Sequence, residues 1–266
     1  MYRKYVPFLL FLFFLYGCNG NKQEEKEDVS VFVDLPQLKA EGEITAVTLY
    51  SSTSYFQYKM QPMGYEYDLI NDFVKSQGLK LNIKVAENPA RLIEMLEAGE
   101  ADVVAYPIPI NNKLKQEVIY CGREDISSQV LIQRANKGDK LLTDVTQLID
   151  KNVYVKPNTK YSERLKNLDE ELGGGIHIQK VENDSIATED LIEMVSLGEI
   201  PYTISDDNTA RLNKTYYWNI NVDLKVSFPQ RSSWVVRKSS PDLAKAIDEW
   251  ACLLYTSPSP RDPKTS

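Results

Sequence analysis

The chain has 266 residues, of which 42% are hydrophobic and 26% charged, and a formal net charge of −7. A polypeptide of this length can bury one large core or two modest ones. The acidic balance argues against a nucleic-acid partner, because contacts to phosphates need a basic surface.

The N-terminus has the form of a secretory signal, residues 1–17. Arg3 and Lys4 precede an apolar run that is too short to cross about 30 Å of hydrocarbon. The run ends in LYGC, which resembles a bacterial lipobox. We therefore expect cleavage after Gly17 and a lipid on the thiol of Cys18; the alternative is a signal anchor with an incidental cysteine.

Two further segments flank the folded part. Residues 18–43 start polar and charged and show no long amphipathic face, which indicates a lipidated tether. Residues 252–266, CLLYTSPSPRDPKTS, resemble an in-frame translation of a sequencing-library adapter, so we expect the biological chain to be cut at about Ala251. Without the net +2 of the signal and the net +1 of this tail, residues 18–251 carry −10. Cys121 then stands alone, and no internal disulfide is expected.

The first half of the folded part alternates strand and helix patterns. EITAVTLY predicts a strand, GYEYDLINDFVKSQG a helix that ends at Gly78, and LKLNIKV a second strand. A helix around ARLIEMLEAG and a strand in ADVVAYPI follow. A β-α-β-α-β series with right-handed crossovers predicts a parallel sheet covered by helices.

A second series begins after SSQVLIQR. It comprises a strand in NVYVK, a helix in YSERLKNLDEEL, a GGG turn, a strand in IHIQKV, another helix and the strand YTIS. The chain then offers a strand in SSWVVRK and a helix in SPDLAKAIDEW, for which we expect Ser240 as N-cap and Pro241 at the first position. We expect this last pair to return to the first lobe.

One pattern occurs twice. LIEMLEAGEADVVAYP, residues 92–107, and LIEMVSLGEIPYTISD, residues 191–206, share four leading residues and place Gly99 and Gly198 in register. The alternative is chance recurrence in two amphipathic helices. The shared offset to glycine and strand favours two lobes built on one plan, each bringing a loop to the same cleft.

Three segments resemble the family 3 solute-binding proteins: GYEYDL, LEAGEADVVAYPIPI and SSQVLIQR. The resemblance implies an α/β, two-lobed periplasmic-binding-protein (type II) clamshell with a parallel-rich sheet in each lobe. It places residues 44–130 and 230–251 in lobe 1 and residues 131–229 in lobe 2. Such proteins hold amino acids and other small polar ligands.

A narrower resemblance rests on IPINNKLKQEVIYCG, ELGGGI and NKTYYWNINVDLKVSFPQRSSWVVRKSSP. These segments are similar to the N-terminal domain of membrane-bound lytic transglycosylase F-like lipoproteins, in which the clamshell precedes a lysozyme-like domain that cuts peptidoglycan. Amino-acid-binding relatives usually carry an arginine that grips the ligand carboxylate, whereas this chain has Leu114 between Lys113 and Lys115. A larger ligand such as a cell-wall peptide would fit, and so would a domain that has lost binding.

Ligands of open α/β sheets bind beyond the carboxyl ends of the strands. This rule selects polar and aromatic side chains that follow predicted strands. In the first lobe they are Ser51, Ser52, Tyr55, Phe56, Tyr106 and Asn111. In the second lobe they are Asn158, Thr159 and Asp206. Arg231 and Trp234 are further candidates for ligand contact because they lie near the expected hinge return of the chain.

The second-lobe candidates suit different ligand groups. Asn158 and Thr159 lie at a helix start, where free backbone N–H groups favour an anion. Asp206 matches the position that receives an ammonium group in the resembled family. Each candidate has a structural alternative: Tyr106 at a core edge, and Asn158, Thr159 and Asp206 as helix caps.

These observations predict a lipid-anchored, extracytoplasmic solute-binding domain, the ligand-sensing part of a truncated lytic transglycosylase, in the Gram-negative envelope on the outer membrane or a periplasm-facing membrane. Its partners would be a small polar ligand, the membrane and, through a missing C-terminal domain, peptidoglycan. The alternatives are a stand-alone importer lipoprotein for amino acids or small peptides, and a dehydratase-like enzyme on the same fold. No motif in the chain indicates catalysis, a cofactor or a metal.

Overall fold

The computed structural model describes residues 33–183 and 186–256. The predicted signal, Cys18 and most of the predicted tether lie outside the described residues. Across the described ranges, no helix combines the length and the apolar character that a membrane crossing requires. The described elements build two five-stranded mixed sheets and a short hairpin, β2 (Phe56–Tyr58) with β3 (Gln61–Met63).

The first sheet has the strand order β4-β1-β5-β12-β6. Its strands are β1 (Glu43–Leu49), β4 (Lys80–Ala86), β5 (Val103–Pro109), β6 (Val118–Ser127) and β12 (Gln230–Arg237). β1 pairs in parallel with β4 and β5, whereas β12 runs antiparallel to both β5 and β6. β12, the last of the described strands in sequence, thus lies between β5 and β6 of the first sheet.

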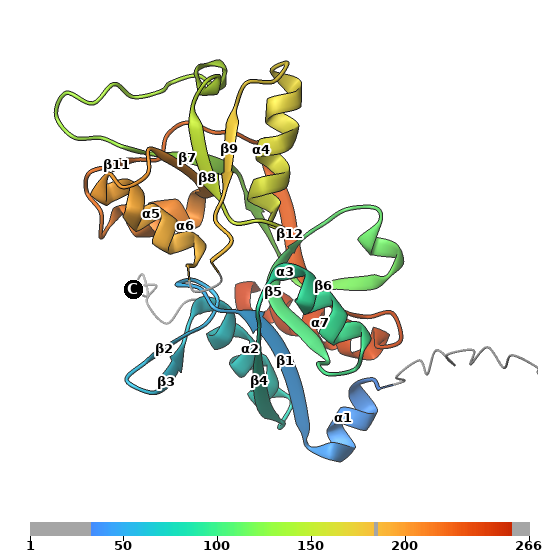
Figure 1. Cartoon of the computed structure of the whole chain (residues 1–266). Helices are drawn as coiled ribbons and strands as arrows, with labels where there is room; N and C mark the ends of the chain where they lie inside the picture. Colours follow the sequence, from blue (N-terminus) through green and yellow to red (C-terminus); the bar gives the residue numbers. More distant parts are fainter. Residues whose placement is uncertain (1–32, 184–185, 257–266) are drawn as a thin grey trace, which may run out of the picture. The chain divides into compact units, whose positions relative to one another are not determined.

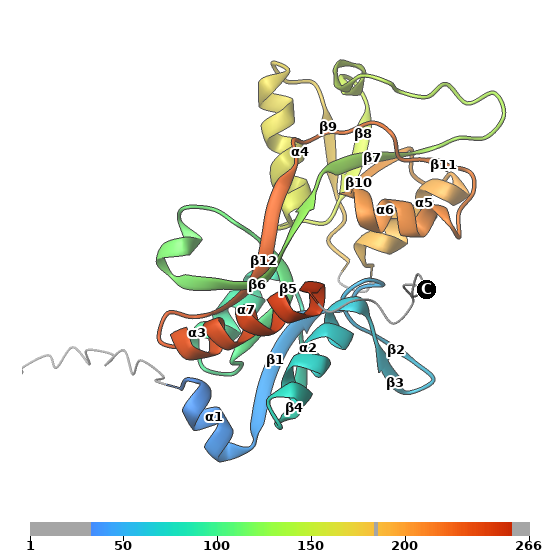
Figure 2. The same cartoon turned by 180° about the vertical axis from the view of Figure 1, so that it is seen from behind.

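Helices cover both faces of the first sheet, because its strands alternate their buried side chains between two cores. One core joins Val103, Ala105 and Val236 to helices α1 (Leu35–Glu41), α2 (Tyr65–Ser76) and α7 (Pro241–Thr256). The other joins Val104 and Val235 to α3 (Pro89–Glu97). Figure 1 shows α3 in front of this sheet, and Figure 2, from behind, shows α2 and α7.

The second sheet has the order β11-β7-β10-β8-β9. Its strands are β7 (Gln129–Arg134), β8 (Asn152–Val155), β9 (His177–Lys180), β10 (Tyr202–Asp206) and β11 (Ile220–Asn221). β8 pairs in parallel with β9 and β10, and β7 runs antiparallel to β10. Helix α4 (Lys160–Glu171) covers one face, and α5 (Thr188–Leu197) with α6 (Asp207–Lys214) covers the other. Two 3₁₀ turns, η1 (Leu114–Gln116) and η2 (Val145–Leu148), lie in connections.

The chain crosses between the sheets twice, at neighbouring points. Ser128 alone separates β6 from β7, and the return ends at Gln230, which pairs with Ser127. The side-chain amide of Gln129 donates to that of Gln230 over 3.4 Å. The prediction of a two-lobed α/β type II fold with parallel strands in each sheet is therefore confirmed. Below, lobe 1 and lobe 2 denote the first and second sheets with their helices.

Several elements of the structure were not predicted from the sequence. The predicted tether ends in a helix, α1, whose Leu38 is buried in the core of lobe 1. β6, the β2–β3 hairpin, β11 and α6 were likewise not predicted. α7 begins at Pro241 as expected and continues through Thr256, into the segment that resembles an adapter.

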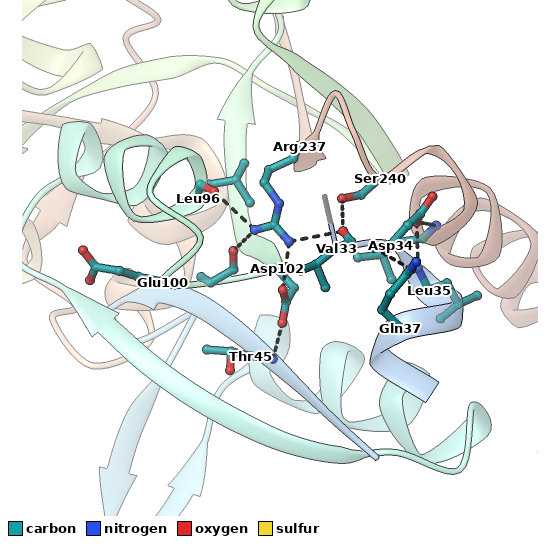
Figure 3. Close-up of polar contacts among 12 residues, drawn as sticks. Val33, Asp34, Leu35, Gln37, Thr45, Leu96, Glu100, Asp102, Arg237 and Ser240 are labelled. Carbon is teal, nitrogen blue, oxygen red and sulfur yellow. Dashed lines mark hydrogen bonds and ion pairs between the residues drawn. The ribbon is translucent and has the colours of Figure 1, made fainter. Parts of the chain in front are cut away.

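The cap of α7 differs from the prediction. The Ser240 hydroxyl donates to the carbonyl of Val33, 2.7 Å away, instead of capping the N-terminus of α7. The carboxylate of Asp34 accepts from the backbone N–H of Asp242 at 3.0 Å and of Leu243 at 2.8 Å. Since Asp34 is also the N-cap of α1, one side chain caps two helices that lie far apart in sequence (Figure 3).

A buried arginine fixes the end of β12 (Figure 3). Arg237 is 6% exposed and its guanidinium meets the Asp102 carboxylate at 2.9 Å. It also donates to the carbonyls of Leu96 and Ala101. Asp102 accepts from the backbone N–H of Thr45 at 2.9 Å, so both partners of the ion pair are held by neighbouring backbone.

Replacing Arg237 by methionine should destabilise the protein by about 3–5 kcal/mol, because Asp102 would remain buried without its counter-ion. Urea denaturation measures this loss. The control is Arg231→Met, which removes the exposed ion pair with Glu124 and should cost less than about 1 kcal/mol. Equal losses in the two variants would contradict this role of the buried pair.

Candidate functional site

The repeated sequence pattern forms the same local structure in both lobes. After α3 and after α5 the chain passes a glycine with left-handed backbone, Gly99 at φ 73° and Gly198 at φ 82°, and enters β5 or β10. A Cβ at Gly198 would also lie 2.4 Å from the guanidinium of Arg134. β5 and β10 are the middle strands of their sheets, so the repeat places Tyr106 on one middle strand and Asp206 at the end of the other.

Asp206 is bound by groups of its own lobe. Its Oδ2 accepts from Lys160 Nζ at 2.5 Å and from the Tyr161 hydroxyl at 3.2 Å. The side chains of Lys160 and Asp206 are 19% and 17% exposed. Asp206 stands at the N-cap position of α6, yet its side chain makes no capping hydrogen bond. The pair therefore presents a compensated carboxylate at the end of β10.

Glu189, in the first turn of α5, reaches across to lobe 1. Its Oε1 accepts from both the backbone N–H and the hydroxyl of Ser52, each at 3.3 Å. Burial raises the pKa of Glu189, although the hydrogen bonds from Ser52 oppose the shift. The loop after β1 and the start of α5 thus meet through a carboxylate, and the sequence candidate Ser52 lies at this junction.

Two tyrosines share the space around these carboxylates. Burial, followed by the negative charges of Asp206 and Glu189, raises the pKa of Tyr106. Burial, followed by Asp206, Tyr106 and Glu189, holds the pKa of Tyr161 well above its usual value. Both hydroxyls remain protonated at neutral pH, so each can donate or accept a hydrogen bond. Tyr106 from lobe 1 and Asp206 from lobe 2 lie close enough to interact.

Several other predicted site residues serve the local backbone. The Ser51 hydroxyl accepts from the N–H of Ser54 at 2.9 Å, and the Asn111 side chain accepts from the N–H of Leu114 at 2.8 Å. Thr159 caps α4 and donates to the carbonyl of Lys156 at 2.9 Å.

The remaining candidates divide between core, turn and surface. Tyr55 is 5% exposed and packs edge-on against Tyr67. Asn158 adopts φ 56° in the turn before α4. Arg231 pairs with Glu124 through both Nε and Nη2, at 2.7 and 2.5 Å. Tyr55 is thus a core residue, Asn158 a turn residue and Arg231 a member of a surface ion pair.

Lys160, Tyr161 and Glu189 were missed by sequence reasoning. The rule that selects residues after strands passes over them, because each lies in the first turn of a helix. Lys160 and Tyr161 directly follow the candidate Thr159, and Glu189 opens the helix of the repeated pattern. Extending the search to the first turn of the helix that follows each strand would have included all three.

A second polar group lies inside lobe 1. The indole N–H of Trp234 donates to Glu66 Oε2 at 2.6 Å, and the Trp234 ring stacks on Trp250 with centroids 6.3 Å apart. Burial raises the pKa of Glu66 to about 7, against the lowering effect of the Trp234 hydrogen bond. Arg123 and its ion-pair partner Asp125 line the same small hollow. Trp234 is thus part of the core, 6% exposed.

Metal chemistry finds no support in the described ranges, which contain no group of three or more His, Cys, Asp or Glu side chains arranged to hold an ion. The only thiol among the core residues there, Cys121, is 3% exposed, and burial raises its pKa. The groups gathered at the candidate site are the hydroxyls of Tyr106 and Tyr161 and the carboxylates of Asp206 and Glu189, which can hydrogen-bond a ligand.

Comparison with known proteins agrees with this fold. Residues 44–257 match the family model of bacterial extracellular solute-binding proteins, family 3. The chain is similar to proteins named membrane-bound lytic murein transglycosylase F, at 30% identity over 218 residues in Desulfosudis oleivorans and 28% over 218 residues in Stutzerimonas stutzeri. These alignments cover 80% and 81% of this chain but 46% and 44% of the relatives. The chain spans less than half the length of these curated relatives.

Solved structures of similar fold are amino-acid-binding proteins. Holo ArgBP from T. maritima aligns with a TM-score of 0.71 at 20% identity, covering 84% of this chain and 95% of that one. The ancestral amino-acid-binding protein AncCDT-1, a precursor of cyclohexadienyl dehydratase, aligns with a TM-score of 0.70 at 18% identity, covering 83% and 92%. At these identities the likeness concerns the fold.

The raised pKa of Glu66 predicts a pH-dependent stability. The folded-state pKa of about 7 exceeds the ordinary 4.5, so the folded protein binds the proton more tightly than the unfolded chain. This stabilisation is complete below pH 4.5 and is lost as the pH rises through about 7, a change on the order of 3 kcal/mol.

Urea denaturation at several pH values measures this dependence, and Glu66→Gln should flatten it. The control Glu97→Gln alters an exposed carboxylate of α3 and should leave the pH dependence as it is. A Glu66→Gln profile that parallels the wild type would show that another group titrates.

Proposed function

Because the chain belongs to the bacterial extracellular solute-binding proteins of family 3, we propose that it binds a small polar solute between its two lobes. The observation that supports this best is the convergence of Tyr106 from β5 with Tyr161, Glu189 and Asp206 from lobe 2. The contact between Ser52 and Glu189 joins the same two lobes. A ligand that touches both lobes favours the arrangement in which they meet, by its differential affinity.

The ligand we propose is a cell-wall peptide fragment. In lobe 1, Leu114 opens η1 and packs, partly buried, against the core, and its neighbours Lys113 and Lys115 are exposed. No bidentate arginine fork therefore stands there for the carboxylate of a free amino acid. The curated relatives are named for murein, which fits a peptide from the same polymer.

We propose further that this chain is the ligand-sensing, N-terminal part of a longer, lipid-anchored protein of the cell envelope. The curated relatives are about twice as long and are named as membrane-bound transglycosylases. Any cutting of peptidoglycan would belong to a domain beyond the matched residues 44–257. In this proposal the lipid on Cys18 holds the protein at the membrane, and the ligand state of the two lobes regulates the catalytic part.

A second candidate is the substrate-binding lipoprotein of an importer. It is favoured by the similar solved structures, several of which are amino-acid-binding proteins, one of them in its holo form. The two candidates differ in the expected ligand, because an importer protein for amino acids binds the free amino acid. Sequencing the uninterrupted gene also separates them: a stop codon soon after Trp250 would support the importer.

Titration calorimetry with a cell-wall peptide and with free amino acids tests the proposed function. We expect the peptide to bind and Tyr106→Ala to weaken it by roughly 10-fold or more, since the variant removes a hydroxyl and a ring from the shared space. The control Tyr216→Ala changes a tyrosine that is 73% exposed in lobe 2 and should leave affinity unchanged.

Tight binding of a free amino acid would transfer the protein to the importer class. Absence of binding by either kind of ligand would reject a solute-binding role.

The proposed anchor is tested by Cys18→Ser. A serine offers no thiol for the lipid, so the variant should leave the membrane fraction and lose labelling by a radioactive lipid precursor. Cell fractionation of the wild type and the variant measures both effects. Membrane association that persists in the variant would rule out lipidation of Cys18 as the anchor.

A further inference from the structure

The candidate site holds two carboxylates with different partners. Asp206 is neutralised by a lysine of its own lobe: Lys160 Nζ lies 2.5 Å from Asp206 Oδ2, and both side chains are less than one-fifth exposed. The hydroxyl of Tyr161, itself 8% exposed, donates to the same oxygen. The chain thus supplies the cation that this carboxylate needs.

Glu189 has no such cation. Among the ion pairs of the described residues, none includes Glu189. Its Oε1 accepts hydrogen bonds from the N–H and hydroxyl of Ser52, at 3.3 Å each, whereas a cationic nitrogen and a carboxylate oxygen typically approach to about 2.7–2.9 Å. These long contacts, with donors that carry no charge, would yield readily to a cation of a ligand.

The surroundings of Glu189 strengthen its attraction for a positive charge. The negative charge of Glu189 contributes to the raised pKa of the Tyr106 hydroxyl in lobe 1 and of the Tyr161 hydroxyl in lobe 2. A partly dehydrated carboxylate attracts a cation more strongly than an exposed carboxylate does. Burial of Glu189 also raises its pKa, which marks the cost of keeping this charge without a counter-ion.

We propose that Glu189, and not Asp206, is the carboxylate that binds a cationic group of the ligand, and that Lys160 sets this choice by neutralising Asp206. The assignment rests on the proposed function and specifies its ligand: a peptide that carries a free amine. Because Glu189 also contacts Ser52, the ligand amine would bind at the junction of the two lobes. The amine would bind the Glu189 carboxylate beside the N–H and hydroxyl of Ser52, or in their place. Ligand binding would thereby affect the contact between the lobes.

The test uses calorimetry with L-alanyl-γ-D-glutamyl-diaminopimelate and with the same peptide acetylated on its amines. The wild type should prefer the free-amine peptide. Glu189→Gln should weaken its binding by roughly 10- to 150-fold and abolish the preference, because a charged hydrogen bond becomes a neutral one.

The matched control removes the other pair as a unit. The double variant Lys160→Met and Asp206→Asn should keep the preference for the free-amine peptide over the acetylated one, since Glu189 still supplies the carboxylate. Lys160→Met alone frees Asp206 and should strengthen binding of the free-amine peptide. Loss of that preference in the double variant, or an unaffected Glu189→Gln, overturns the assignment.

Failure of the wild type to bind either peptide would reject the proposed ligand class. The assignment is then decided by carboxyl carbon-13 NMR during titration with methylammonium chloride. A shift of the Glu189 carboxyl signal, with Asp206 unmoved, supports the assignment. A shift at Asp206 alone, or at neither carboxyl, overturns it.

Discussion

The insertion of β12 between β5 and β6 is the constraint on which the rest of the structure depends. The chain leaves lobe 1 through β6, builds all of lobe 2, and must then return into the sheet that it left. The pairing of Arg237 with Asp102 fixes the far end of that returning strand, because a buried guanidinium must find its counter-ion there. Asp34 adds a second anchor by capping α7 directly after β12. Lobe 2 is consequently held at two neighbouring chain crossings.

This arrangement explains why the repeated pattern ends at one site. In each lobe the helix, the left-handed glycine and the following strand deliver the chain into the middle of a sheet. The middle strand is flanked on both sides, so its position is set by its neighbours, and the residue near its carboxyl end is set with it. Tyr106 and Asp206 are therefore placed by the most constrained strands of the molecule, whereas the loop that carries Ser52 is placed by its own local hydrogen bonds.

The sequence predicted what depends on local periodicity, and it missed what depends on distant contacts. The alternation in β1 and β4, the apolar faces of α2 and α3 and the position of Pro241 are local signals, and the corresponding elements were found. The capping of α7 by Asp34 joins residues separated by 209 positions, which no periodic pattern records. At the candidate site, Tyr106 and Asp206 follow from the rule about strand ends. The Lys160 that neutralises Asp206 does not, because a lysine in the first turn of a helix ordinarily points to solvent.

Within the described ranges, the hydrogen bonds between Ser52 and Glu189 join the lobes away from the two crossings, and this contact sets what a ligand must provide. The Ser52–Glu189 hydrogen bonds are long and lie at the surface, so together they contribute on the order of 1 kcal/mol. This free energy favours the arrangement in which the lobes meet but is too small to hold them there permanently. Tyr106 and Tyr161 offer hydroxyls without charge, and Asp206 is already compensated by Lys160. The remaining source of strong, directional attraction across the junction is the unpaired carboxylate of Glu189. On the proposed function, a ligand amine bound to Glu189 would therefore strengthen the contact between the lobes.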